Sequence, residues 1–179
     1  LFRSGRARIR YGSCPGRQPS PQCHGGQRHA VLDGRQGLEI LAHDEVGLAG
    51  GDDLDRVLAE KMCSMAGVEA ASVGHDAWIR WRVEAERVKC ALSEREIETF
   101  AIPFFDGTNS FSREVSRVDF SEWIQPWIAR TISCCRRALS DARLLPNEID
   151  ALVLVGGSSR IPAVRSAVES LFGRVADLS

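Results

Sequence analysis

Two groups of residues have the types and spacing that could bind a small polar ligand. The first lies on a stretch with helical periodicity, where Glu86, Lys89 and Ser93 fall within an arc of about 60° at 100° per residue. A carboxylate, an ammonium group and a hydroxyl on one side of a helix can bind the hydroxyls of a ribose and the polar edge of a base. The same spacing is also typical of a solvated i, i+3 ion pair, so it leaves both interpretations open.

The second group follows an unbroken apolar run at 151–155 and consists of Gly156, Gly157, Ser158, Ser159 and Arg160. Ligands of open α/β sheets bind outside the carboxyl ends of strands. Glycines let a flat ligand approach the backbone, and a guanidinium can stack on a base or pair with an anion. The alternative is a tight turn that needs a positive φ, followed by a surface arginine. The segment is neither a GxxxxGK[ST] phosphate loop nor a GxGxxG dinucleotide turn.

Amphipathic helices and a hairpin are predicted to position the first group. A short strand at 38–41 and a loop at 46–51 precede a helix that begins near Asp52, where three aspartates favour a helix N-terminus. A second helix is predicted from His75 to Ser93. Strands at 97–105 and 111–115, joined by a turn at 106–109, predict a hairpin.

A long helix, a buried strand and a last helix are predicted to position the second group. The long helix has Ser116 as its N-cap, and Pro126 is expected to kink or restart it. The apolar run at 151–155 is typical of a strand covered on both faces, as in a parallel sheet. The last helix starts near Pro162 and stops at Gly173.

Composition indicates a globular protein rather than a membrane or disulfide-rich one. The 179 residues are 44% hydrophobic and 26% charged, which allows one ordinary core or two small ones. There are six cysteines without a CxxC pair, and no run approaches the roughly 18 apolar residues of a membrane helix. The N-terminus has no apolar signal core. We therefore expect a reduced, cytoplasmic protein without a membrane partner.

The charge is divided unevenly along the chain, which places a boundary near Gly37. Residues 1–37 contain seven arginines and one acidic residue, whereas acidic residues exceed basic ones from residue 38 onward. We expect residues 1–37 to be a disordered or poorly packed basic arm, or a segment translated out of frame. Charge alone does not favour nucleic-acid binding, because only Phe2 and Tyr11 could stack on bases. The set Cys14, Cys23, His24 and His29 matches no common zinc spacing.

Three motifs in order resemble the 70-kilodalton heat-shock chaperones of the DnaK and HscA type. They are Gly50-Gly51-Asp52-Asp53-Leu54-Asp55, the segment 86–93 (ERVKCALS) and the segment 153–162 (VLVGGSSRIP). The resemblance covers about Leu38 to Arg174. It implies an α/β fold: an incomplete second lobe of the actin-like (ribonuclease H-like) ATPase fold, with a small hairpin-plus-helices subdomain. The implied domains are a basic arm at 1–37, the lobe at 38–174 and a tail at 175–179.

The resemblance also implies roles for individual residues. The adenosine of ATP or ADP would be held between the two groups, with Glu86, Lys89 and Ser93 on ribose and base. In the other group, Gly157 and Ser158 would line the nucleoside beside Gly156, Ser159 would replace the family's usual threonine, and Arg160 would pack on adenine. Gly50 and Gly51 would lie toward the phosphates.

The departures from the family pattern limit the predicted activity. Residues 30–35 do not form the family's Asp-x-Gly-Gly-Gly-Thr phosphate loop, and neither the first lobe nor the substrate-binding domain is found. We therefore predict the adenosine-binding part of a DnaK-type chaperone that acts in protein folding. It would bind nucleotide weakly, with no catalytic residue assigned and without binding the family's magnesium on its own.

Three alternatives remain open. The chain could be a nucleotide-independent interaction module for exchange factors or co-chaperones, through its hairpin subdomain. It could be a related actin-like protein such as a sugar kinase or a filament-forming ATPase, against which the segment 86–93 argues. It could also be a non-functional, truncated gene product.

Overall fold

The computed structural model describes residues 7–13, 28–33, 40–46, 50–154 and 156–178. The chain divides into two compact units, which are described separately below. One comprises Gly51–Gln125 and is called the hairpin unit; the other comprises Leu1–Gly50 with Pro126–Ser179 and is called the sheet unit. The predicted hairpin-plus-helices subdomain therefore has a counterpart in the hairpin unit.

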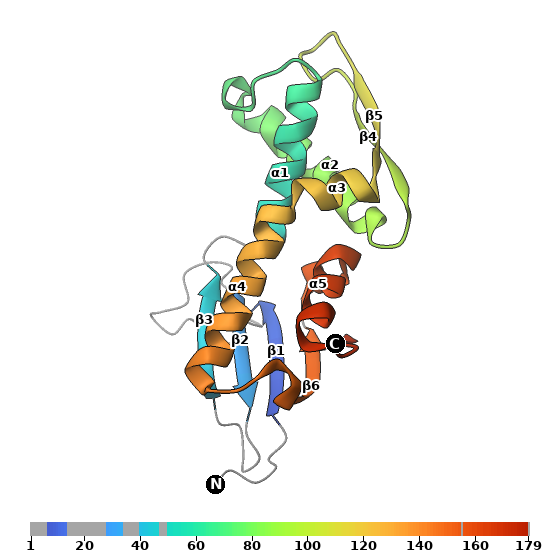
Figure 1. Cartoon of the computed structure of the whole chain (residues 1–179). Coiled ribbons are helices and arrows are strands. Elements are labelled where there is room, and N and C mark those ends of the chain that lie inside the picture. Colours follow the sequence, from blue (N-terminus) through green and yellow to red (C-terminus); the bar gives the residue numbers. More distant parts are fainter. Residues whose placement is uncertain (1–6, 14–27, 34–39, 47–49, 155, 179) are drawn as a thin grey trace, which may run out of the picture. The chain divides into compact units, whose positions relative to one another are not determined.

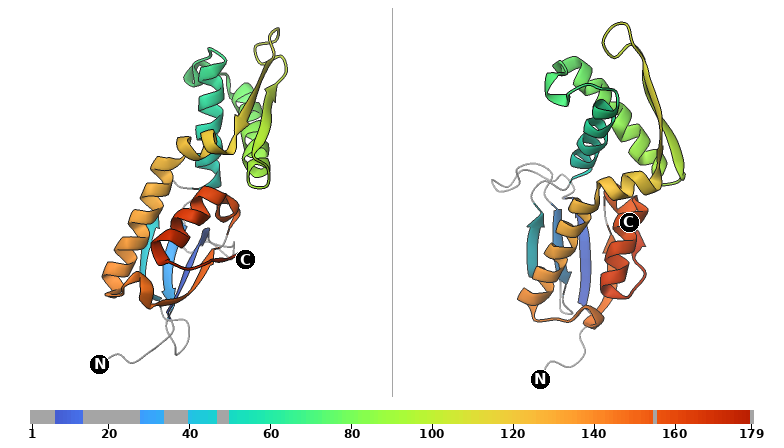
Figure 2. Two further views of the ribbon diagram at one scale, coloured as in Figure 1. Left: turned by 45° about the vertical axis from the view of Figure 1, so that its right-hand side comes forward. Right: turned by 45° about the horizontal axis from the view of Figure 1, so that its top comes forward.

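The sheet unit is built on a mixed sheet of five strands in the order β3-β2-β1-β6-β7. β1 and β3 each pair antiparallel with β2, whereas β6 is parallel to both β1 and β7. Two helices, α4 and α5, cover the same face of this sheet (Figures 1 and 2). The strands are β1 Ala7–Ser13, β2 Arg28–Asp33, β3 Ile40–Val46, β6 Ile149–Leu154 and β7 Asp177–Leu178, and the helices are α4 Gln125–Ala142 and α5 Pro162–Phe172.

Apolar side chains of α4, β6 and α5 form the core of the sheet unit. Ile149, Leu152 and Leu154 of β6 are buried, whereas Ala151 and Val153 are partly exposed. The predicted parallel pairing of this strand is confirmed. The strand was also expected to be covered on both faces of the sheet. In the structure both helices lie over one face, and alternate residues of β6 point away from them. The other core residues are Cys135, Ala138, Leu139, Val168, Phe172 and Ala176.

Two strands lie within the segment that was predicted to be a disordered basic arm. β1 and β2 pair residue by residue, for example Ile9 with Leu32. Disorder is therefore wrong for residues 7–13 and 28–33, and the strands on either side of Gly37 belong to one sheet. The amino-acid composition does not reveal these strands, because their backbone hydrogen bonds are made with neighbouring strands. It also does not show that Ile9 and Tyr11 alternate with arginines at the period of a strand. Cys14, Cys23 and His24 lie outside the described residues.

The hairpin unit contains two long helices, a two-stranded hairpin and a short helix. α1 and α2 pack side by side, and β4 packs along α2 (Figure 1). The helix that was predicted to begin near Asp52 starts at Gly51, and the one predicted to reach Ser93 ends at Leu92 with Ser93 as its C-cap. The elements are α1 Gly51–Met65, α2 His75–Leu92, β4 Ile97–Ile102, β5 Phe111–Ser116 and α3 Arg117–Trp123, with a 3₁₀ turn at Ala70–Ser72.

Trp81 of α2 is at the centre of an aromatic core that joins this helix to the hairpin. Its ring lies 5.6 Å from that of Phe100, 5.8 Å from Phe111 and 5.9 Å from Phe105, measured between centroids. Trp81 and Phe100 are almost completely buried. Aromatic rings at these separations bury a large apolar area and add a favourable ring contact, so the hairpin and α2 are held as one body.

A capped helix follows the hairpin, and a new helix begins beside a proline, as predicted. The Ser116 hydroxyl accepts from the backbone N–H of Asp119 at 3.0 Å, and the Asp119 carboxylate accepts from the Ser116 N–H. α3 ends at Trp123, and Pro126 is the second residue of α4. A proline is tolerated there because the first turn of a helix has no use for its N–H.

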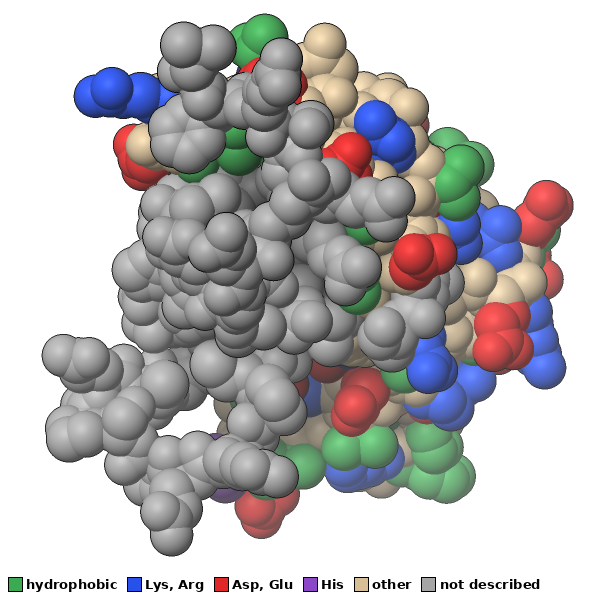
Figure 3. All heavy atoms as spheres, turned by 90° about the horizontal axis from the view of Figure 1, so that it is seen from below, with side chains coloured by type: hydrophobic (Ala, Val, Ile, Leu, Met, Phe, Trp, Pro, Cys, Tyr) green, Lys and Arg blue, Asp and Glu red, His purple; other side chains and the backbone are tan. Residues whose placement is uncertain are grey.

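In the view of Figure 3, acidic and basic side chains lie interspersed where described residues reach that face. Within the described ranges, every helix is too short or too polar to cross a lipid bilayer.

Candidate functional site

The C-terminal half of α2 carries the first group of predicted residues. Glu86 is exposed, whereas Lys89 and Ser93 are partly buried. The Ser93 hydroxyl donates to the Lys89 carbonyl at 3.3 Å, so it also satisfies a carbonyl of the last helical turn. Because α2 is a regular helix over these residues, the three side chains project from one side of it, as the spacing predicts.

Lys89 is paired with Asp55 of α1, and this contact was missed at the level of sequence. The Lys89 ammonium lies 2.7 Å from Oδ1 and 2.8 Å from Oδ2 of Asp55, and it donates to the Gly51 carbonyl at 3.3 Å. The Lys89 side chain is 11% exposed and the Asp55 side chain 4%. The partner of Lys89 therefore lies on another helix and is not Glu86, which the i, i+3 alternative had named.

Asp55 is a carboxylate on the buried side of its helix. Burial raises the pKa of Asp55 above its ordinary value, while the hydrogen bond and charge of Lys89 act in the opposite direction. From its place near the start of the helix, Asp55 was predicted to favour the helix N-terminus together with Asp52 and Asp53. A signal was present, because Asp55 shares a side of the helix with the apolar residues Leu58 and Ala59 at i+3 and i+4, where a carboxylate needs a buried partner.

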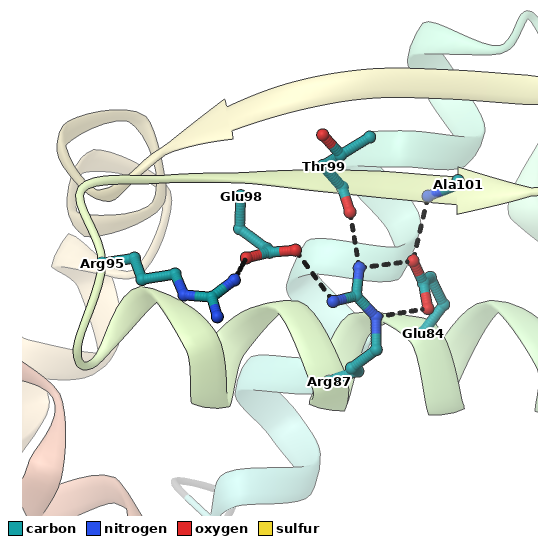
Figure 4. Close-up of polar contacts among 6 residues, drawn as sticks. All are labelled: Glu84, Arg87, Arg95, Glu98, Thr99 and Ala101. Carbon is teal, nitrogen blue, oxygen red and sulfur yellow. Dashed lines mark hydrogen bonds and ion pairs between the residues drawn. The ribbon is translucent and has the colours of Figure 1, made fainter.

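An ion-pair network fastens the opposite side of α2 to strand β4 (Figure 4). Arg87 donates two hydrogen bonds to Glu84 and one to Glu98, each at 2.9 Å. Glu98 also accepts from Arg95 at 2.9 Å, and Glu84 accepts from the Ala101 backbone N–H at 3.0 Å. The hydrogen bonds from Arg87 and then Arg95 lower the pKa of Glu98. α2 is thus held from two sides, by α1 and by the hairpin.

The second group forms a tight turn between β6 and α5, with the positive φ that the alternative interpretation of these residues named. Gly156 has φ 98° and ψ 161°, which a residue with a Cβ rarely adopts. A 3₁₀ turn follows at Gly157–Arg160, in which the Ser159 N–H donates to the Gly156 carbonyl at 3.0 Å. The Ser159 hydroxyl donates to the same carbonyl. α5 then begins at Pro162, as predicted.

The residues of this turn divide into a buried pair and an exposed pair. Ser158 and Ser159 are buried, at 3% and 2% exposure, whereas Gly157 and Arg160 are exposed. A ligand at the surface would therefore meet Gly157 and the guanidinium of Arg160, while Ser159 stabilises the turn. The first group belongs to the hairpin unit and this turn belongs to the sheet unit.

The chain matches a protein-family model described as Hsp70 protein over residues 29–179. This range contains both groups of candidate residues. It also contains residues 29–37, which were predicted to belong to the basic arm.

Chaperones named HscA are similar to this chain. The identity is 37% over 146 residues with an HscA homolog of Delftia acidovorans, which covers 81% of this chain and 23% of the relative. It is 38% over 142 residues with HscA of Pectobacterium carotovorum, covering 76% and 21%, and 35% over 137 residues with HscA of Escherichia coli, covering 76% and 21%. The chain thus spans between a fifth and a quarter of the length of these relatives. With a family match over most of its residues, the chain belongs to the Hsp70 family.

Proposed function

We propose that this chain binds the adenosine part of ATP or ADP, as part of the second lobe of an actin-like nucleotide-binding domain. Glu86, Lys89 and Ser93 contact ribose and base, and Arg160 packs on adenine beside Gly157. The family membership supports this proposal, because adenine nucleotides are the expected ligands of the Hsp70 family.

The observation that carries the proposal is the turn after β6. β6 runs parallel to both of its neighbours, and the turn lies at its carboxyl end, where ligands of open α/β sheets bind. Gly156 bends the backbone, Gly157 has no side chain to block a flat ring, and Arg160 is exposed. A planar guanidinium in this position suits stacking on a purine.

The other residues support contacts to the nucleoside more than to the phosphates. Gly156, Ser158 and Ser159 shape the turn, and Gly50 and Gly51 are proposed to lie toward the phosphates without a basic side chain beside them in sequence. Among the described residues, no three His, Cys, Asp or Glu side chains gather as a metal site. The expected affinity is therefore weak, because charge-assisted contacts to phosphate are the stronger ones.

Isothermal titration calorimetry with ADP tests the proposal. Arg160→Ala combined with Lys89→Ala should abolish measurable heat, because it removes one cation from each group. The matched control is Arg174→Ala combined with Lys61→Ala, which removes two exposed cations outside both groups and should leave the heat unchanged. Undiminished heat in the first double variant would contradict the assigned residues.

A second candidate function is an interaction with exchange factors or co-chaperones through the hairpin. Phe104 favours it, because this phenylalanine in the loop between β4 and β5 is 63% exposed and has φ 50°, a conformation that is uncommon for a bulky residue. A pull-down with an exchange factor, with and without ADP, separates the two functions. Capture that is independent of ADP and is lost in Phe104→Ala would support the interaction module.

We further propose that the chain is part of a chaperone acting in protein folding in the cytoplasm. The HscA relatives support this role, and this chain matches about a fifth of their length. Client binding and hydrolysis belong to the longer proteins in this proposal, so the measurable property of this chain is nucleotide binding.

A further inference from the structure

The Lys89–Asp55 pair sets the position of the one lysine assigned to the nucleoside. Asp55 lies in the second turn of α1 and Lys89 in the last turn of α2, 34 residues apart. Both oxygens of the carboxylate are within 2.8 Å of the ammonium, and the side chains of Asp55 and Lys89 are 4% and 11% exposed. A lysine side chain otherwise has large rotamer freedom, so this contact selects one position for the ammonium.

The pair leaves Lys89 with a donor for a ligand. An ammonium group has three N–H donors. Among the described residues, two of them make hydrogen bonds, to Asp55 Oδ2 and to the Gly51 carbonyl, while Asp55 Oδ1 at 2.7 Å makes an ion-pair contact without a hydrogen bond. The remaining donor belongs to a group whose charge is balanced by a neighbouring carboxylate. Such a group suits a neutral acceptor, such as a ribose hydroxyl or a ring nitrogen, better than a phosphate.

We propose that Asp55 is a positioning residue that orients and neutralises Lys89 so that it recognises the neutral nucleoside rather than the phosphates. This inference rests on the proposed function, since it assigns a supporting residue to the same site. It goes beyond an ordinary structural ion pair, because Asp55 then affects ligand affinity only through Lys89.

The chain offers a direct spectroscopic readout of this role, because Lys61 and Lys89 are its only lysines. NMR of the full chain with labelled lysine gives two side-chain signals. A held Lys89 should show two separate shifts for its ε-methylene protons, and these should merge in Asp55→Asn. The exposed Lys61 on α1 is the internal control and should give one averaged shift in both proteins.

Calorimetry with ADP and with adenosine then tests the effect on binding. Loss of one oriented, charge-assisted donor should weaken binding by about tenfold in Asp55→Asn, by the same factor for both ligands. In a Lys89→Met background, Asp55→Asn should change the Kd by less than about twofold, because the residue through which it acts is gone. Asp55→Glu keeps the negative charge and serves as the test variant if Asp55→Asn does not fold. Asp55→Glu should weaken binding less than Lys89→Met does.

The outcomes separate this inference from the proposed function. If the wild-type chain binds neither ligand while the Lys89 signal is that of a held side chain, the proposed function fails and Asp55 is a structural partner only. If the chain binds ADP but Asp55→Asn releases Lys89 without changing either Kd, the positioning role is overturned and the proposed function stands. A loss for ADP without a loss for adenosine also overturns it, because the pair would then act on the phosphates.

Discussion

Replacing Gly156 and Gly157 one at a time by alanine tests the geometry of the turn after β6. The two glycines are neighbours, but only Gly156 has a positive φ, at 98° with ψ 161°. Gly157 lies in the 3₁₀ turn, and a Cβ added there would meet no described atom within 4 Å. Alanine therefore strains the native backbone at Gly156 and fits it at Gly157.

The expected difference follows from the backbone alone. Replacing glycine by alanine restricts the unfolded chain to the same extent at both positions, which favours folding by about 0.4–1 kcal/mol when the native conformation is compatible. Forcing a residue with a Cβ into the conformation of Gly156 costs about 1–3 kcal/mol. The unfolded-state contribution cancels between the two variants, so Gly156→Ala should be less stable than Gly157→Ala by about 1–3 kcal/mol.

Amide hydrogen exchange on the full chain measures this difference where it arises. Under conditions in which exchange reports the opening equilibrium, amides of β6 and α5 give the free energy of opening of the sheet unit. Gly156→Ala should lower it, while Gly157→Ala should leave it unchanged or raise it slightly. Amides of α2 in the hairpin unit serve as the control. Equal protection in the two variants would refute the conformation assigned to Gly156.

Two further predictions concern the hairpin unit. Phe100→Ala should destabilise it by about 3–5 kcal/mol, because Phe100 is buried against Trp81. Phe104→Ala, at an exposed position, should change its stability by less than about 0.5 kcal/mol. Urea unfolding followed by tryptophan fluorescence measures both variants, and similar losses of stability would contradict the aromatic core. Hydrogen bonds from Asn109 and then Thr108 lower the pKa of Asp106 from 3.8 to about 2. The stability that these contacts contribute should therefore be fully present above pH 3.8 and be lost as the pH falls through about 2. An NMR titration of the Asp106 carboxyl group with a midpoint near 3.8 would contradict this.

Local features of the fold could be predicted because each depends on neighbours in the chain. The periodicity of apolar residues predicted α2 to within one residue of its end at Leu92. The Ser116 cap predicted the start of α3, and Pro126 predicted that the helix restarts, as it does at α4. A positive φ at the turn after β6 was one of the two interpretations that its glycines left open, and Gly156 has it. Caps, prolines and glycines act through backbone geometry within a few residues, so sequence is sufficient for them.

The candidate site was found only in part from sequence. The spacing of Glu86, Lys89 and Ser93 placed them on one side of a helix, and their roles toward a nucleoside stay a prediction. The spacing could not show that Lys89 is held by Asp55, because no local rule joins residues 34 apart. Nor could it show which side chains of the turn are exposed, since the burial of Ser158 and Ser159 depends on how the turn packs.

Only the tertiary structure shows which residues far apart in the chain contact one another. The sequence by itself determined the helices, the hairpin, the turn chemistry and the family, because these are written in local patterns and in motif order. Strands at residues 7–13 and 28–33 form despite a composition typical of a disordered arm, since their backbone groups are satisfied by other strands. Asp55 is buried as a carboxylate because a distant lysine supplies the opposite charge. In both cases the interaction that stabilises the folded chain involves a partner far away in the sequence, which no local pattern specifies.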